Sequence, residues 1–185
     1  ECKFIVESGR EVITKQVDAH KLFMKLITNN WDFAEPGILF WDKIENYNLL
    51  SEDKNFKYAG VNPCAEEPLP SGGSCLLGSL NLAAFVETIN GQPQFNMDEF
   101  RKAVVIVVYG LNDVLDEGLL LHPLEVQRNS VRDWRQIGLG IMGLADMLIK
   151  LGVTYGSEES LEICDNIGWN LANEALSTSM TIAKN

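Results

Sequence analysis

The stretch Asn62-Pro63-Cys64-Ala65-Glu66 places an amide, a thiol and a carboxylate at alternate positions of the chain. In an extended backbone, side chains two residues apart point the same way, so these three groups would project from one face. Pro63 lacks an N–H and pushes the residue before it towards extended conformations, which favours an exposed loop over a helix. A thiol beside a carboxylate and an orienting amide suits cysteine-based chemistry on a hydroxylated substrate.

A second thiol, Cys75, lies close by in the sequence. The link to it contains Pro68, Pro70, Gly72 and Gly73, which predicts that no regular structure forms there. The residues from 75 to 82 are apolar enough to predict a buried strand. The whole stretch from about 58 to 82 is therefore expected to be a loop followed by a strand, with Cys75 on or beside that strand.

Composition limits the classes of function open to the chain. It has 185 residues of which 46% are hydrophobic, enough for one folded domain with a core. The net charge of −11 argues against binding polymeric nucleic acid, although loop amides could still hold a mononucleotide. No apolar run reaches the roughly 20 residues of a membrane span, and no secretory leader is evident.

The four cysteines are dispersed, and none forms the close pair typical of structural zinc sites. We therefore expect no metal site, and a reducing, cytoplasmic setting.

Local signals predict a helix-rich chain with a few short strands. Residues 1–16 read as a hairpin, and Asn90-Gly91 as a tight turn. Helices are expected where capping residues precede periodic apolar positions. The predicted helices run from Asp18 to about Trp31 with Leu22, Phe23, Leu26 and Ile27 as the apolar stripe; over about 38–47 with Phe40, Trp41 and Ile44 inward; from Asn96 to about Glu117 with Phe100, Val104, Val107, Leu111 and Val114 buried; over 144–151, ended by Gly152; and from Ser157 onward with Leu161, Cys164, Gly168, Leu171 and Ala175 buried.

A glycine pattern at Gly138, Gly140 and Gly143 matches the letters of a dinucleotide-binding fingerprint. That fingerprint needs a hydrophobic strand before its first glycine, and residues 131–136 make a poor strand. The simpler interpretation is close backbone packing in a strand-to-helix segment over about 135–152. A nicotinamide-dependent dehydrogenase remains a weak alternative.

Longer motifs add a resemblance to a known family. Three segments, in this order along the chain, resemble the ribonucleotide reductase large (catalytic) subunit: the stretch around its active site, one upstream and a glycine-rich one downstream. The likeness covers almost the whole chain. The matching segments are 35–42 (EPGILFWD), 62–70 with 73–82 (NPCAEEPLP and GSCLLGSLNL) and 135–146 (RQIGLGIMGLAD).

The resemblance implies a role for each residue of the loop. Cys64 corresponds to the cysteine that becomes a thiyl radical and abstracts the ribose 3′ hydrogen. Glu66 corresponds to the carboxylate that takes the 3′-hydroxyl proton, and Asn62 to the amide that positions substrate and carboxylate. Cys75 corresponds to one of two reducing cysteines. The substrate-binding stretch is then Asn62, Pro63, Cys64, Ala65 and Glu66.

The resemblance also implies the surroundings of the site. The fold would be α/β, with residues 1–185 a helix-rich fragment of a single catalytic domain, the ten-stranded α/β barrel. The Asn-Pro-Cys form and the short spacing of the two thiols look most like the adenosylcobalamin-dependent (class II) enzymes. Two departures, Ala65 where Gly is frequent and Leu76 where Asn is common, affect the loop's fine geometry.

The expected function is that of an internal fragment of a ribonucleoside di- or triphosphate reductase, inactive alone. Its partners would be ribonucleotide substrate, the remainder of the barrel and a thioredoxin-like reductant, in deoxyribonucleotide synthesis for DNA replication. Because of these roles, Cys64 and Cys75 should be free thiols. The alternative from another class is a non-catalytic helical interaction domain derived from that barrel.

Overall fold

The computed structural model describes residues 2–8 and 11–184, and the chain divides into two compact units. The first unit is Glu1–Asn48 and the second is Leu49–Asn185. Each unit is described below by itself.

The first unit contains a strand pair and two helices. Strand β1 (Cys2–Ser8) pairs antiparallel with β2 (Glu11–Val17), which confirms the expected hairpin, while its turn at 9–10 lies outside the described residues. Helix α1 (Ala19–Phe33) begins where the Asp18 carboxylate accepts a hydrogen bond from the Lys21 amide at 3.1 Å. Helix α2 (Trp41–Asn46) is shorter than predicted.

The apolar stripe of α1 stays largely exposed in the part of the chain that the structure describes. None of the residues of α1 is buried, and Leu22 and Phe23 are each 56% exposed. Phe40, expected to point inward, is also exposed. Periodicity therefore predicted the helix correctly, whereas burial depends on neighbours that a single helix does not supply.

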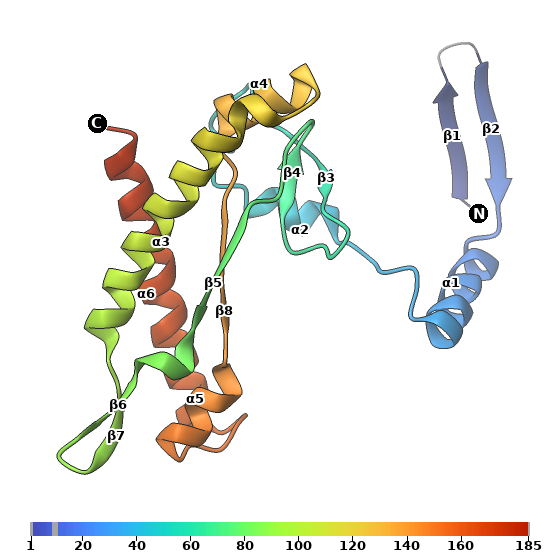
Figure 1. Cartoon of the computed structure of the whole chain (residues 1–185). Helices are drawn as coiled ribbons and strands as arrows, with labels where there is room; N and C mark the ends of the chain where they lie inside the picture. Colours follow the sequence, from blue (N-terminus) through green and yellow to red (C-terminus); the bar gives the residue numbers. More distant parts are fainter. Residues whose placement is uncertain (1, 9–10, 185) are drawn as a thin grey trace. The chain divides into compact units, whose positions relative to one another are not determined.

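The second unit combines paired strands with long helices (Figure 1). Two antiparallel pairs, β3 with β4 and β6 with β7, flank a parallel pair, β5 with β8. Its elements are β3 (Tyr58–Val61), β4 (Pro68–Pro70), β5 (Leu77–Asn81), the 3₁₀ turn η1 (Leu82–Phe85), β6 (Val86–Ile89), β7 (Gln92–Phe95), α3 (Met97–Gly118), the 3₁₀ turn η2 (Leu119–Leu121), α4 (Glu125–Trp134), β8 (Gly138–Met142), α5 (Leu144–Leu151) and α6 (Glu158–Ile182).

The parallel pair is the α/β feature of this unit. Leu77 of β5 aligns with Gly138 of β8, and the register continues to Asn81 and Met142. Parallel strands need a long crossover, and here α3 and α4 supply most of it. In Figure 1 the two strands run side by side along the unit. The strand expected after Cys75 is confirmed, but in β5 only Leu80 is buried.

One prediction about the linker was wrong. Residues 68–70, expected to lack regular structure because of their prolines, form β4 and pair with β3. Proline is tolerated in a two-stranded pair because its missing N–H can face away from the partner.

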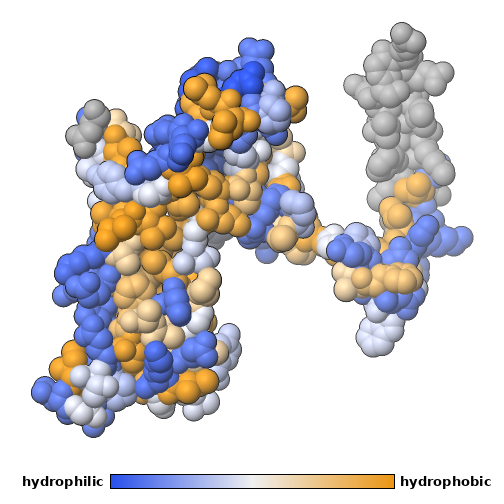
Figure 2. Space-filling model, in the orientation of Figure 1, coloured by the Kyte–Doolittle hydropathy of each residue, from blue (hydrophilic) through white to orange (hydrophobic). Residues whose placement is uncertain are grey.

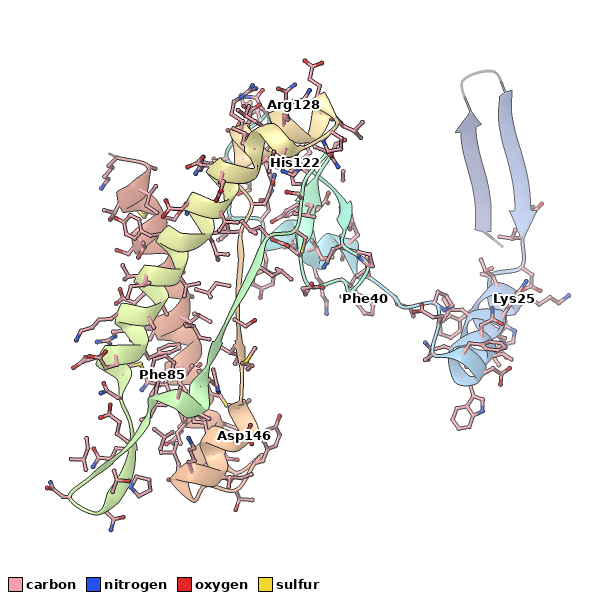
Figure 3. The ribbon with its side chains drawn as sticks, in the orientation of Figure 1. Lys25, Phe40, Phe85, His122, Arg128 and Asp146 are labelled. Atoms are coloured by element: carbon pink, nitrogen blue, oxygen red, sulfur yellow. The ribbon has the colours of Figure 1, made fainter. Side chains whose placement is uncertain are left out.

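The core lies where α3 and α6 pack together with β5, η1 and α5. Phe100 is fully buried and meets Phe85 edge to face, with ring centroids 5.4 Å apart; Phe85 is labelled in Figure 3. Figure 2 shows apolar side chains gathered over the face where α3, α6 and the parallel strands lie. The buried core residues are Leu80, Leu82, Ala83, Phe100, Val104, Val108, Met147, Leu148 and Ile167.

The predicted helix faces were partly displaced. On α3 the predicted Phe100, Val104 and Leu111 are buried. Val108 and Leu115 are buried in place of the predicted Val107 and Val114, and Val114 is 52% exposed. On α6, Leu171 and Ala175 pack against the core as predicted, but Leu161 is exposed. A rotation by one residue follows when the partner helix, and not the local pattern alone, selects the face that is buried.

Turn and cap predictions held closely. The Asn96 side chain accepts a hydrogen bond from the Glu99 amide at 3.0 Å, and α3 begins there. Asn90 and Gly91 both have positive φ and join β6 to β7. Gly143 has φ +70° and starts α5, and Gly152 ends it.

The glycine pattern is a strand followed by a helix, as the packing interpretation expected. Its first two glycines lie inside β8, and a helix, α4, precedes them. The hydrophobic strand that a dinucleotide site requires before the glycines is therefore missing from residues 125–137.

Candidate active site

The loop that carries Cys64 joins β3 to β4 and occupies residues 62–67. It is a tight turn, in which the Ala65 amide donates to the Asn62 carbonyl at 2.9 Å. Ala65 adopts φ +66°, a left-handed conformation that suits glycine better than a residue with a Cβ. The expectation of a non-helical loop is confirmed, but its backbone turns and is not extended, so the alternation argument for a shared face does not apply.

Two reciprocal hydrogen bonds close the neck of this loop. The Asn62 amide donates to the Glu67 carbonyl at 3.3 Å, and the Glu67 amide donates to the Asn62 side-chain oxygen at 3.0 Å. The Asn62 side chain is thereby fixed by the backbone across from it. Because Glu67 immediately precedes β4, the same bonds hold its side chain at the edge of the strand pair.

Cys75 reaches the loop through a second turn. The Gly73 amide donates to the Pro70 carbonyl at 3.0 Å, which reverses the chain after β4. Gly72 has φ +73°, and a Cβ there would lie 2.8 Å from the Val126 carbonyl oxygen of α4. This close approach needs glycine, and it directs the following residues back towards Asn62.

The Cys75 thiol contacts both residues of the neck. Its sulfur accepts from the Asn62 side-chain nitrogen at 3.7 Å and donates to the Glu67 carboxylate, Sγ to Oε2, at 2.5 Å. The hydrogen bond to Glu67, followed by burial and the Glu67 and Glu66 charges, raises the pKa of Cys75 to about 11, and the Asn62 bond opposes the rise. The thiol is therefore protonated at neutral pH.

The remaining predicted residues lie on the turn itself. Pro63, Cys64, Ala65 and Glu66 are all exposed. Within the described part of the chain, the Cys64 thiol has no hydrogen-bond partner, and Cys64 and Cys75 are both free, as predicted. Glu66 lies close enough for its charge to act on the Cys75 thiol. The structure thus joins Asn62 and Cys75 by contact and presents Cys64 and Glu66 beside them.

Glu67 is the residue that reasoning from the sequence missed. The doublet Glu66-Glu67 was only a partial signal, because it shows a second carboxylate beside the loop but not that this carboxylate contacts Cys75. Gly138 of β8 gives the second clue, because a Cβ there would lie 3.3 Å from Glu67 Oε1. The same Cβ would lie 2.5 Å from Leu77 Cδ2, so this glycine makes room chiefly for Leu77 of β5, with Glu67 as the next neighbour.

Two kinds of feature are absent from the described residues: a metal-ligand cluster and a membrane-spanning helix. No group of three or more His, Cys, Asp or Glu side chains among them could hold a metal ion. Within residues 2–8 and 11–184, no helix has the length and apolar character needed to cross a bilayer.

Comparison with known proteins identifies relatives over nearly the whole chain. A vitamin B12-dependent ribonucleoside-diphosphate reductase of Thermoplasma acidophilum is 34% identical over 97% of the chain, and one of Mycobacterium tuberculosis is 30% identical over 93%. The alpha subunit of a ribonucleoside-diphosphate reductase of Chlamydia pneumoniae is 31% identical over 97%. The chain spans only 22%, 24% and 17% of these relatives' lengths, respectively.

Structural similarity agrees with the sequence relatives. The class Id ribonucleotide reductase alpha subunit of Actinobacillus ureae matches with a TM-score of 0.72 over 89% of the chain and 32% of that subunit, at 24% identity. This supports the expected α/β barrel fold. The family model described as "Ribonucleotide reductase, barrel domain" matches residues 5–185. A match of that extent makes the chain a member of the ribonucleotide reductase barrel-domain family.

Proposed function

We propose that the chain forms part of the catalytic barrel of an enzyme that converts ribonucleotides to deoxyribonucleotides by thiyl-radical chemistry. The observation that carries this proposal is an exposed free thiol, Cys64, two residues from Asn62, whose side chain contacts a second free thiol, Cys75. The relatives named as ribonucleotide reductases support the same reaction. We further propose that residues 1–185 belong to one catalytic domain, because the family match runs from 5 to 185.

The roles divide between the two thiols. Sulfur can hold an unpaired electron and exchange hydrogen with carbon, so the exposed Cys64 would abstract the ribose 3′ hydrogen. Glu66, two residues on, would take the 3′-hydroxyl proton as a general base. Asn62 would position substrate and carboxylate from the neck of the loop. Cys75 would supply one of the two thiols whose oxidation to a disulfide reduces the ribose.

Adenosylcobalamin is the proposed cofactor of the whole enzyme, because relatives are named as vitamin B12-dependent. When bound, it would supply the radical that oxidises a cysteine thiol. No group of three or more His, Cys, Asp or Glu side chains among the described residues could hold a metal ion, and we assign no residue of this chain to the cofactor. The proposed setting is the cytoplasm, with a thioredoxin-like protein as reductant and DNA synthesis as the purpose.

The test is an assay of the whole protein with ribonucleoside di- and triphosphates, with and without adenosylcobalamin. Wild type should form deoxynucleotide, and only with the cofactor. Cys64→Ser should lower turnover by about 1000-fold or more, because a hydroxyl cannot replace sulfur in the radical step, and should leave substrate binding nearly unchanged. Cys75→Ser should bind substrate but stall before deoxynucleotide forms. Substantial deoxynucleotide production by Cys64→Ser would refute the assignment, and no production by wild type would favour the non-catalytic interaction domain.

A further inference from the structure

We infer that Glu67 is a positioning residue for Cys75: it holds the thiol proton at rest and accepts that proton when the thiol is oxidised. The inference rests on the proposed function, and it extends the site by a residue to which neither motif nor family match gives a role. It is carried by the direct contact between the Cys75 sulfur and Glu67 Oε2.

Backbone structure selects Glu67 over its neighbour Glu66. Glu67 stands at the neck, with its amide and carbonyl both bonded to Asn62. It is partly buried, whereas Glu66 is exposed on the turn. One carboxylate is thus held against Cys75, while the other stays available to a substrate in front of the loop.

The glycine-rich strand β8 begins beside this carboxylate. Gly138 begins β8 and pairs with Leu77, two residues after Cys75. A Cβ at Gly138 would approach both the Leu77 side chain and Glu67 Oε1. The absence of a side chain at 138 therefore makes room chiefly for Leu77, whose Cδ2 would lie 2.5 Å from that Cβ, and relieves a closer approach to Glu67 Oε1, at 3.3 Å.

The electrostatics agree with this geometry. Glu67 and Glu66 are the charged groups that act on Cys75, and Asn62 is its polar neighbour. The hydrogen bond to Glu67, followed by burial and the two carboxylate charges, raises the pKa of the thiol from 9.0 to about 11, while the Asn62 hydrogen bond opposes the rise. The protonated thiol is favoured below pH 9, and the advantage disappears as the pH rises through about 11.

Oxidation of Cys75 releases a proton, and the Glu67 carboxylate can accept it. Net oxidation of Cys75 and a second cysteine thiol elsewhere in the enzyme breaks two S–H bonds, forms one S–S bond and releases two electrons and two protons. Those electrons and protons break the ribose C2′–O bond, form a C2′–H bond and release the hydroxyl as water. The Glu67 carboxylate already accepts a hydrogen bond from the Cys75 thiol, so the proton can leave the sulfur along this existing bond.

The test measures alkylation of Cys75 by iodoacetamide between pH 7 and 11.5, in the whole protein, with peptide mass spectrometry as readout. Glu67→Gln should move the midpoint from about 11 towards 9.0. At pH 8 the thiolate fraction would rise about 100-fold, but the less basic thiolate is a weaker nucleophile, so the rate should rise about tenfold. Glu67→Asp keeps the charge but shortens the side chain, and should give an intermediate midpoint.

Two controls make the result specific. Cys164 on α6 is an internal reference whose alkylation should not change. Glu162→Gln removes an exposed carboxylate of α6 and should leave the Cys75 midpoint in place. An unchanged midpoint in folded Glu67→Gln and Glu67→Asp would overturn the inference, as would an equal shift in Glu162→Gln.

Turnover tests the accepting role separately. Glu67→Gln should lower kcat by about 100-fold with little change in KM, because proton acceptance is lost and substrate contacts are kept. An unchanged kcat would overturn the accepting role. If wild type reduces no ribonucleotide, the proposed function fails, whereas the alkylation midpoint still reports whether Glu67 holds the Cys75 proton.

Discussion

In the loop at residues 62–67 polar atoms make the contacts, whereas around Phe100 apolar side chains make them. The loop is closed by backbone and amide hydrogen bonds, and four of its residues are exposed. Phe100 is fully buried among rings and aliphatic side chains of the core. The difference teaches that reactive groups and stability are placed in separate parts of this unit, so each can be changed with little effect on the other.

Truncating the core should give the largest loss of stability. Phe100→Ala removes a fully buried ring and should cost about 3–5 kcal/mol of unfolding free energy. Ile106→Ala on the same helix, where the side chain is 69% exposed, should change it by only about 0.5 kcal/mol. Urea unfolding measures both. If Phe100→Ala were as mild as Ile106→Ala, the core would not be where stability resides.

Adding a side chain at Gly72 should give the next largest loss of unfolding free energy. Gly72 and Gly91 have nearly the same φ, +73° and +79°, but only Gly72 has a neighbour, the Val126 carbonyl, in the way of a Cβ. Alanine should cost about 1 kcal/mol at either position from the left-handed backbone, and roughly 1–3 kcal/mol more at Gly72 from overlap. The difference in unfolding free energy between Gly72→Ala and Gly91→Ala measures the cost of the overlap with the Val126 carbonyl.

The Gly72→Ala variant also tests whether this turn positions Cys75, independently of the change in unfolding free energy. Displacement of the 72–75 segment should weaken the contact between Cys75 and Glu67, so Cys75 alkylation should speed up in Gly72→Ala and stay unchanged in Gly91→Ala. Equal stability losses at the two glycines, with no change at Cys75, would show that the approach to Val126 does not direct this segment.

The smallest effect is expected at Ala65, and with the opposite sign. Ala65→Gly should stabilise the protein by about 0.5 kcal/mol, because glycine adopts φ +66° without the Cβ clash. Ala172→Gly, at an exposed position inside α6, should instead destabilise it by about 1 kcal/mol. Thermal unfolding compares the pair. Destabilisation by both glycines would mean that the turn at Ala65 carries no backbone strain.

Local signals predicted the parts of the fold that depend on neighbouring residues. Asn96, Ser157 and Asp18 cap helices, and Asn90-Gly91 turns a hairpin, because each effect needs only three or four residues. The pairing of β5 with β8 could not be read in this way, because its partners are about 60 residues apart.

The active-site loop shows the same limit. Its residues were recognisable from motif letters, and its non-helical form from Pro63. The Glu67 contact to Cys75 was not predictable, because it requires the hairpin neck at Asn62 and the reversal at Gly72 to form first. Two of the five predicted positions on α3 were wrong for a related reason: Leu115 is buried in place of Val114, and Val108 in place of Val107, because distant packing partners select the buried face.

The most direct test of the division between the two thiols is release of label from ribose C3′ in a single turnover of the whole protein. With 3′-tritiated substrate, we predict that Cys75→Ser releases label into water without forming deoxynucleotide, because its defect lies after hydrogen abstraction. Cys64→Ser should release none, although its unfolding free energy matches that of wild type. Release of label by Cys64→Ser at the wild-type rate would contradict the assignment of the 3′ step to Cys64.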